Sequence, residues 1–314
     1  MDEIIYPEDK KGQFLALFEK NLDKLENLFN ISISRRGNKI MFEGDQGEQK
    51  KFKKYMEDLF KTIEEKSDFN KNDFNLSLSM VREGKISSIG KELMESNKIV
   101  INGKVVYPKT FNQKQYIKAS IANDLVFALG PAGTGKTFLA IALALHHLLS
   151  KKVERIVLTR PVVEAGEKLG FLPGDIQQKI NPYLRPLYDS LYYLIGFERT
   201  SDLIGREIIE IAPLAYMRGR TINNAFIILD EGQNTINSQM QMFLTRFGEN
   251  SKVIVTADLS QIDITSPQRS GIFKPIKILN SIKGIEFIRL NDGDVVRHNL
   301  VREIIRAYEN AEKK

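Results

Sequence analysis

The sequence predicts an α/β fold in which a parallel sheet is sandwiched by helices. Apolar runs of strand length, separated by helical stretches, span residues 125–129, 155–159, 225–229 and 252–256. Their apolar residues are continuous rather than alternating, which is typical of strands that are buried on both faces. Strands that alternate with helices in this way indicate βαβ crossovers and hence a parallel sheet.

A Gly-rich loop directly follows the first of these runs. Residues 130–137 match the pattern G-x-x-x-x-G-K-[ST], whose glycines let backbone N–H groups point into one concavity. The helix expected from Lys136 adds the positive end of its dipole. In this pattern the lysine contacts the β- and γ-phosphates, and Thr137 coordinates Mg²⁺. We therefore predict a P-loop ATPase core that takes ATP and Mg²⁺. The predicted nucleotide contacts in the loop are Gly130, Pro131, Ala132, Gly133, Thr134, Gly135, Lys136 and Thr137.

Two carboxylates end the third apolar run. Asp230 is predicted to hold Mg²⁺ and Glu231 to polarise the attacking water, so Lys136 and Glu231 are catalytic candidates. Adjacent carboxylates favour hydrolysis over phosphoryl transfer to a metabolite. After the fourth run, Gln261 is the candidate sensor of the γ-phosphate, supported by Asp258. The alternative is a loop that caps the next element.

Two other enzyme classes fit these residues less well. Residues 70–73 match the N-K-x-D pattern of guanine recognition, but they precede the phosphate loop and follow no apolar strand. The spacing after Asp230 also lacks the D-x-x-G pattern of switch GTPases. A small-molecule kinase is disfavoured by the Asp230–Glu231 pair and by Arg160-Pro161 at the end of the second run.

The segment before the core predicts a small KH-like domain. Residues 1–66 predict an αββα unit, with helices over 13–29 and 48–65 and a hairpin between them that turns at Gly37-Asn38. No G-x-x-G loop occurs in this segment, which argues against an RNA clamp and favours docking or ring assembly. Residues 67–107 are predicted as a linker with a helical segment and a β-hairpin, and residues 108–314 as the ATPase core.

Net charge and composition limit the cellular location and the classes of partner that we expect. The net charge is +6, and the excess lies after residue 67: residues 1–67 hold 13 basic and 14 acidic side chains, the remainder 33 and 26. A basic core suits a nucleic-acid partner. The chain has no cysteine, which excludes disulfides and thiolate metal sites. It has no apolar run of membrane-spanning length and no signal-peptide pattern at its start, so we expect a cytoplasmic protein.

The motifs together resemble the PhoH family of phosphate-starvation-type ATPases. The resemblance is carried by P-K-T-F-N-Q-K-Q-Y at residues 108–116, A-L-G-P-A-G-T-G-K-T at 128–137, I-L-D-E-G-Q-N-T at 228–235, and segments 160–175, 212–221, 242–247 and 294–298. They extend over nearly all of 108–308, and the combination is highly specific. The first 66 residues also resemble the front domain of the longer, YbeZ-type members. Two residues depart from the family pattern: Gly232 replaces the usual Ala and Ala257 the usual Gly, which would be strained if the position needed a positive φ.

The resemblance extends to the motor core of superfamily 1 helicases and implies further roles. Gln113 would read adenine with Tyr116 near the base, and Arg160 would contact the backbone of a single strand. A homo-oligomeric ring with an arginine finger acting in trans is expected, and its candidates are Arg218, Arg220 and Arg297.

The resemblance also implies a function and partners. The leading expectation is an RNA-linked ATPase in RNA or ribosome metabolism with weak helicase activity. Its protein partner would be a YbeY-type endoribonuclease or a ribosome-associated protein. The alternative is a nucleotide-gated assembly factor that binds protein partners and unwinds nothing.

Overall fold

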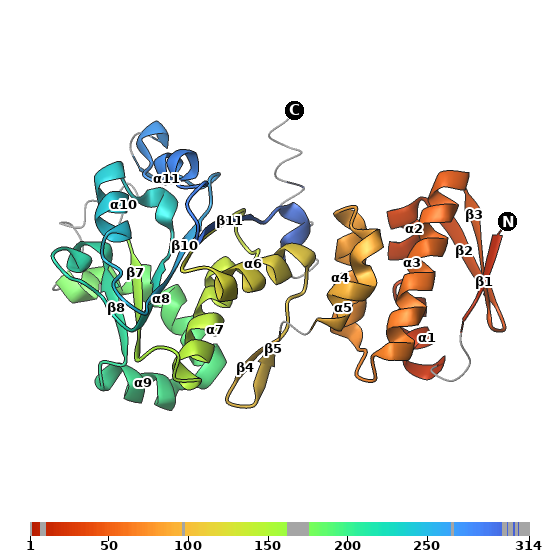
Figure 1. The fold of residues 1–314 in the computed structure, drawn as a ribbon, viewed down its shortest axis with the longest axis horizontal. Coiled ribbons are helices and arrows are strands. Elements are labelled where there is room, and N and C mark those ends of the chain that lie inside the picture. Colours follow the sequence, from red (N-terminus) through yellow and green to blue (C-terminus); the bar gives the residue numbers. More distant parts are fainter. Residues whose placement is uncertain are drawn as a thin grey trace. The chain divides into compact units, whose positions relative to one another are not determined.

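The computed structural model describes residues 2–6, 11–95, 98–161, 176–264 and 267–296, together with Leu300, Ile304 and Ala307 (Figure 1). The chain forms two compact units. The first consists of residues 1–97 and 107–114, and the second of residues 98–106 and 115–314. None of the described helices combines the length and the apolar character that crossing a bilayer requires.

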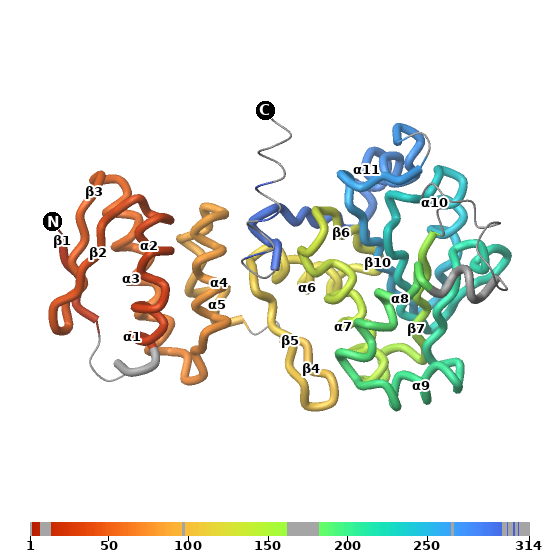
Figure 2. Tube along the Cα trace, turned by 180° about the vertical axis from the view of Figure 1, so that it is seen from behind, coloured from red at the N-terminus to blue at the C-terminus, as the bar shows by residue number. Residues whose placement is uncertain are grey.

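The first unit is built on a three-stranded antiparallel sheet of order β1-β3-β2. Its elements are β1 (Asp2–Ile5), α1 (Lys11–Glu19), α2 (Leu22–Phe29), β2 (Ile31–Arg36), β3 (Lys39–Gly44), α3 (Gln46–Glu65), α4 (Lys71–Arg82) and α5 (Ile89–Met94). Arg36 pairs with Lys39, so Gly37 and Asn38 form the two-residue turn that the sequence predicts. Helices α2 and α3 pack against the sheet, as Figure 2 shows.

This unit differs from the predicted αββα order in two places. Strand β1 precedes it, and it was not predicted because only Ile4 of its four residues is buried. The single helix expected over 13–29 is two helices, α1 and α2. At the break, the Asn21 side-chain amide donates to the Leu17 carbonyl over 2.7 Å. An Asn side chain that bonds to nearby backbone competes with the helical ladder.

The predicted linker is divided between the two cores. Helices α4 and α5 bury apolar side chains in the same cluster as α2 and α3, including Phe74, Met80 and Leu93. The first unit therefore extends well past residue 66. The hairpin of β4 (Ile99–Ile101) and β5 (Lys104–Val106) packs its buried residues into the core of the second unit instead. Helix α4 was predicted as part of a linker because it begins with an Asn- and Lys-rich stretch, although apolar residues that follow it are buried.

The N-K-x-D pattern is a helix cap. Asn70 is the N-cap of α4: its side chain accepts from the Asn72 N–H over 2.9 Å, and its own N–H donates to Asp73 over 3.0 Å. Such a reciprocal arrangement satisfies backbone groups at a helix start. The pattern therefore has a structural explanation within the first unit.

The second unit contains a six-stranded parallel sheet of order β11-β6-β10-β9-β7-β8. Its strands are β6 (Leu125–Leu129), β7 (Arg155–Arg160), β8 (Ile209–Pro213), β9 (Ala225–Leu229), β10 (Lys252–Ala257) and β11 (Ile285–Arg289). The four inner strands are the four predicted ones, and the predicted α/β fold is confirmed. The edge strands β8 and β11 were not predicted, because their half-exposed residues do not form continuous apolar runs.

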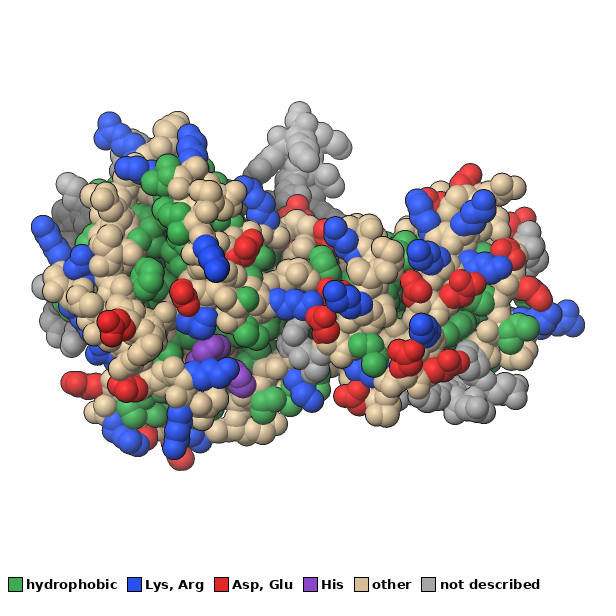
Figure 3. Space-filling view, viewed as in Figure 1, with side chains coloured by type: hydrophobic (Ala, Val, Ile, Leu, Met, Phe, Trp, Pro, Cys, Tyr) green, Lys and Arg blue, Asp and Glu red, His purple; other side chains and the backbone are tan. Residues whose placement is uncertain are grey.

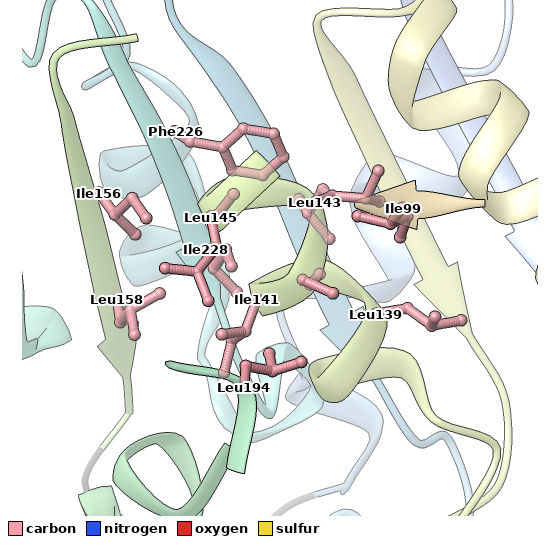
Figure 4. Packing of buried hydrophobic residues seen from close by; sticks show 14 of the residues in the cluster. Ile99, Leu139, Ile141, Leu143, Leu145, Ile156, Leu158, Leu194, Phe226 and Ile228 are labelled. Atoms are coloured by element: carbon pink, nitrogen blue, oxygen red, sulfur yellow. The ribbon is translucent and has the colours of Figure 1, made fainter. Parts of the chain in front are cut away.

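Helices cover both faces of this sheet. One face packs against α7 (Lys136–Leu149), α8 (Ile176–Ile195), α9 (Phe197–Gly205) and the latter part of α6 (Phe111–Ala122). Figure 4 shows Ile141 and Leu145 of α7 directed at Ile156, Leu158 and Ile228 of the strands. The other face packs against α10 (Asn237–Leu244) and α11 (Phe273–Ile278). Alternate residues of each inner strand enter the two clusters, so every inner strand is buried on both faces.

Candidate nucleotide site

The phosphate loop begins where β6 ends, in close contact with the chain that follows β11. Gly130 has a φ of +157°, and a Cβ at this position would lie 2.6 Å from the Leu290 carbonyl oxygen. The Leu290 N–H donates to the Leu129 carbonyl over 2.7 Å, which fixes this approach. Gly133 and Gly135 also have positive φ, at 83° and 82°. The loop therefore needs glycine where it curls, as the pattern predicts.

Lys136 begins α7 and is folded over this loop. Its Nζ donates to the carbonyls of Gly130 at 2.6 Å and Pro131 at 2.9 Å. Burial lowers the pKa of Lys136, while the negative charges of Asp258, Glu231 and Asp230 oppose that shift. Lys136 is therefore buried at the phosphate loop and held by two carbonyls of the loop itself.

Thr137 and Asp230 meet across the site. The Thr137 hydroxyl donates to Oδ1 of Asp230 over 2.5 Å, although the two residues are 93 positions apart in sequence. Asp230 follows β9 and is buried, with 3% of its surface exposed. A hydroxyl beside a carboxylate supplies the hard oxygen ligands that suit Mg²⁺, whose other positions are taken by water and substrate phosphates. The predicted metal residues therefore fit the ion.

Glu231 lies beside Asp230 in an unusual backbone conformation. Its φ is 56° and its ψ 42°, the left-handed region that residues other than Gly and Asn rarely occupy. Its Oε1 pairs with Nη2 of Arg160 at 3.0 Å. Burial raises the pKa of Glu231, Asp230 adds to the rise, and Gln233, Arg160 and Lys136 oppose it. Six other non-Gly residues of the described chain have a positive φ, so it is the position of Glu231 beside Asp230 that makes this conformation relevant to the site.

Gln233 is a functional candidate that the sequence analysis missed. It is fully buried, and its Nε2 donates to Oε2 of Glu231 and, over 3.1 Å, to the Gln261 carbonyl. Its Oε1 accepts from the Asp258 N–H over 3.0 Å. The side chain thus joins the acidic motif after β9 to the loop after β10. The Asp-Glu-Gly-Gln order was the only signal of this role in the sequence, because Asp258 and Gln261 are 25 and 28 positions away from Gln233.

Two buried side-chain oxygens in the described part of the chain lack a hydrogen-bond partner, Thr159 Oγ1 and Asp258 Oδ2. The other oxygen of Asp258 accepts from both the backbone and the hydroxyl of Ser260, at 2.9 and 2.6 Å. Buried polar oxygens normally have a partner. Asp258 therefore keeps one oxygen available for water or an ion beside the phosphate loop.

A pocket of about 300 Å³ brings the predicted residues together. Its lining includes Lys136, Thr137, Arg160, Asp230, Glu231 and Gln261, as well as the loop residues Ala132, Gly133 and Gly135. Gln261 is exposed and contributes to this lining. Its role as a γ-phosphate sensor stays a prediction.

Other predicted residues have structural contacts of their own. Gln113 lies in the first unit, where its side chain accepts from the Lys109 N–H over 2.8 Å near the start of α6, so its role toward adenine stays a prediction. Tyr116 is fully buried and donates to the Lys136 carbonyl over 3.3 Å. Its ring therefore supports the start of α7 and is not exposed to a base, contrary to the expectation.

The candidate finger residues also differ from one another. Arg220 forms a bidentate pair with Glu210 at 2.6 and 2.7 Å, which lowers the pKa of Glu210. Arg218 is exposed on the loop after β8. Arg297 lies outside the described residues, as do residues 162–175 of the predicted motif that begins at Arg160.

The two departures from the family pattern are accommodated. Ala257 is the last residue of β10 and has no positive φ, so the suspected strain is absent. Gly232 begins a 3₁₀ turn, Gly232–Asn234, and a Cβ there would lie 2.7 Å from Val255 Cγ1. Glycine at position 232 therefore leaves room for the Val255 side chain of the neighbouring strand β10.

This sheet and this loop define a P-loop protein of the nucleotide-binding ATPase class. The PhoH-like protein family model matches residues 105–309, and the chain belongs to that family. It is 44% identical over 310 residues to the PhoH-like protein of Bacillus subtilis (strain 168), covering 98% of this chain and 94% of the relative. The resemblance stated from the motifs is thereby confirmed.

More distant similarities are found as well. Protein PhoH of Escherichia coli (strain K12) is 41% identical over 234 residues, which is 73% of this chain and 64% of that protein. Among solved structures, the helicase domain of Pyrococcus furiosus Hef aligns with a TM-score of 0.37 at 15% identity, over 59% of this chain and 38% of the other.

Proposed function

We propose that this chain is a Mg²⁺-dependent ATPase whose turnover is coupled to RNA, in RNA or ribosome metabolism. The observation that carries the proposal is the meeting of four groups in one pocket: Lys136, Thr137, Asp230 and Glu231. Thr137 and Asp230 are within 2.5 Å of each other, and Glu231 follows directly. A phosphate-binding loop that faces a metal carboxylate and a second carboxylate is the arrangement that ATP hydrolysis requires.

Each residue has a distinct task in this proposal. The ammonium group of Lys136 exchanges its loop carbonyls for oxygens of the β- and γ-phosphates. Thr137 and Asp230 would hold Mg²⁺, which neutralises charge on those phosphates when it is bound. Glu231 orients the attacking water and accepts its proton, and the raised pKa of Glu231 makes it a better proton acceptor. Gln233 holds the Glu231 carboxylate in place.

The RNA link is supported by charge and by Arg160. The basic excess of the chain lies after residue 67. Arg160 brings a guanidinium group to the pocket from the end of β7, and guanidinium groups bind phosphates through two parallel hydrogen bonds. The second candidate is an assembly factor gated by nucleotide. It would use the same ATP site without binding single-stranded RNA. The ring, the protein partner and weak unwinding stay predictions.

The decisive measurement is ATP turnover with and without single-stranded RNA. Lys136→Ala should lose nucleotide affinity, whereas Glu231→Gln should bind ATP and fail to turn it over. Stimulation of the wild type by RNA, absent in both variants, is the expected result. Arg185→Ala, an exposed arginine on α8, is a matched control for loss of surface charge.

The possible negative results separate the two functions. A wild type that hydrolyses ATP slowly and ignores RNA would favour the assembly factor and remove the RNA link. A tailed-duplex assay then tests unwinding, because stimulation without strand separation would exclude a helicase. A folded wild type that binds ATP but releases no phosphate would end the ATPase proposal.

A further inference from the structure

The contact between Arg160 and Glu231 joins two roles that the sequence analysis treats separately. Arg160 ends β7 and Glu231 follows β9, and these strands are neighbours in the sheet. Nη2 of Arg160 lies 3.0 Å from Oε1 of Glu231, and Nη1 donates to the Tyr183 carbonyl of α8 over 2.9 Å. The candidate strand contact is therefore bound to the candidate base.

This contact occupies the base. Oε1 of Glu231 pairs with the guanidinium group and Oε2 accepts from Gln233, so both carboxylate oxygens have partners. A carboxylate oxygen that already accepts a hydrogen bond has fewer lone pairs left for an attacking water. In this arrangement the side chains of Arg160 and Gln233 fix the position of the Glu231 carboxylate.

The pair is also accessible to a competing anion. The side chains of Arg160 and Glu231 are 20% and 29% exposed, and both line the pocket. Partly exposed ion pairs contribute little net stability because solvent screens them. A phosphate diester offers the same guanidinium group two oxygens in a geometry that it matches well.

We propose that Arg160 is a latch: it restrains Glu231 in the absence of a strand, and a phosphate of single-stranded RNA takes its guanidinium group and releases the carboxylate. This inference rests on the proposed ATPase function and its RNA link. Arg160 acts through Glu231 and is thus a positioning residue. The latch would make hydrolysis depend on strand binding.

The test is the basal turnover of Arg160→Ala in the full chain, measured without RNA. Removal of the latch should raise basal turnover roughly tenfold, the factor that corresponds to about 1.4 kcal/mol. RNA should then add little further stimulation. A variant that is merely destabilised would lose activity, so destabilisation cannot explain a gain. The control Arg185→Ala should leave basal turnover unchanged.

A second variant shows whether the gain passes through the base. Arg160→Ala combined with Glu231→Gln should be as inactive as Glu231→Gln alone. If this double variant keeps the gained activity, the gain comes from elsewhere and the latch is overturned.

The outcomes separate the latch from the RNA link. A basal gain in Arg160→Ala, with a wild type that RNA stimulates, supports both. A basal gain with a wild type that ignores RNA keeps the restraint of Glu231 and removes RNA as its trigger. Unchanged or reduced basal turnover in Arg160→Ala overturns the latch, whatever RNA does to the wild type.

Discussion

The hydroxyl of Thr256 donates a hydrogen bond of 2.6 Å to Oδ1 of Asp230. Thr256 lies in β10 and Asp230 follows β9. The two strands are neighbours in the sheet, so a side chain of one strand holds the carboxylate that follows the other. The same oxygen accepts from Thr137, at the start of α7. The sheet and α7 therefore set the orientation of Asp230 at the proposed metal position.

We expect Thr256→Val to weaken the apparent affinity for Mg²⁺ roughly tenfold, because a hydrogen bond to a charged group contributes about 1.5–3 kcal/mol. Valine keeps the shape and removes only the donor. Titration of ATP turnover with Mg²⁺ measures the effect. Thr256→Ser retains the hydroxyl and should behave like the wild type. Equal Mg²⁺ dependence in the valine variant would show that this bond does not orient Asp230.

Gln233→Ala should reduce kcat by about tenfold or more while the KM for ATP changes little, because it removes the donor that holds Glu231. Gln261→Ala provides the comparison, since Gln261 is the residue that the sequence favoured. Steady-state kinetics of both variants decide between them. A large loss in Gln261→Ala alone would restore Gln261 as the principal polar group of this loop.

Gly232→Ala should destabilise the second unit by about 1–3 kcal/mol, the usual cost of overpacking a core. The new methyl group would lie 2.7 Å from Val255 Cγ1. Val255→Ala removes that atom, so the double variant should lose less stability than the two single losses combined. Chemical denaturation of all four proteins gives the coupling energy. Additive losses would mean that Val255 moves aside at no cost.

Arg218 and Arg220 should respond differently to replacement by alanine. Arg220→Ala loses the pair with Glu210, which is about one-third exposed and so contributes about 1 kcal/mol or less. Arg218→Ala should leave stability unchanged and, if Arg218 is the finger in trans, reduce turnover about 10³-fold.

A mixing experiment identifies a finger that acts between subunits. Arg218→Ala and Lys136→Ala proteins are each inactive in this prediction, but a mixed assembly contains some intact sites. Recovery of turnover on mixing is the expected result. Failure to recover, together with recovery in the same experiment with Arg297→Ala, would transfer the role to Arg297.

Acid should destabilise the second unit through His147. Burial lowers the pKa of His147, with Lys152 and Lys252 adding to the shift and the bond to the Leu143 carbonyl opposing it. The unfolded state then binds the proton more readily, so the stabilisation is present above about pH 6.5 and is lost as pH falls through the folded pKa. Figure 3 shows the histidine pair of α7 beside basic side chains.

The check is the dependence of the unfolding midpoint on pH between about 5 and 7.5. His147→Gln should flatten that dependence, since glutamine carries no titrating group. His146→Gln removes the adjacent histidine of the same helix and gives the comparison. An unchanged slope in His147→Gln would assign the acid sensitivity to other groups.

The features that could be predicted best from the sequence are those that depend on a local pattern of residues. The inner strands and the phosphate loop could be located because burial on both faces and the need for glycine leave marks within a few residues. Asp230 and Glu231 followed from their position after such a strand. The edge strands β8 and β11 escaped prediction, because half-exposed strands lack a continuous apolar run.

The relationships between distant residues were beyond sequence reasoning. Arg160 and Glu231 are 71 positions apart, and only the order of strands β9 and β7 brings them together. In the sequence, Gln233 resembles an ordinary turn residue. Only the fold brings its partners in the loop after β10 next to it. Helices α4 and α5 were assigned to a linker because their polar residues outweigh the apolar ones that reach the core.

The strand order also bears on how the protein is made. Among the six strands of the sheet, β6 emerges first from the ribosome, yet its neighbours β10 and β11 are the last two to be synthesised. The strand that leads into the phosphate loop therefore has both edges unpaired until residue 257 has left the exit tunnel, and one edge unpaired until residue 289 has left it. Unpaired strand edges attract other chains. Among the strands of this sheet, the one that leads into the phosphate loop is thus exposed longest to such contacts while the chain is being made.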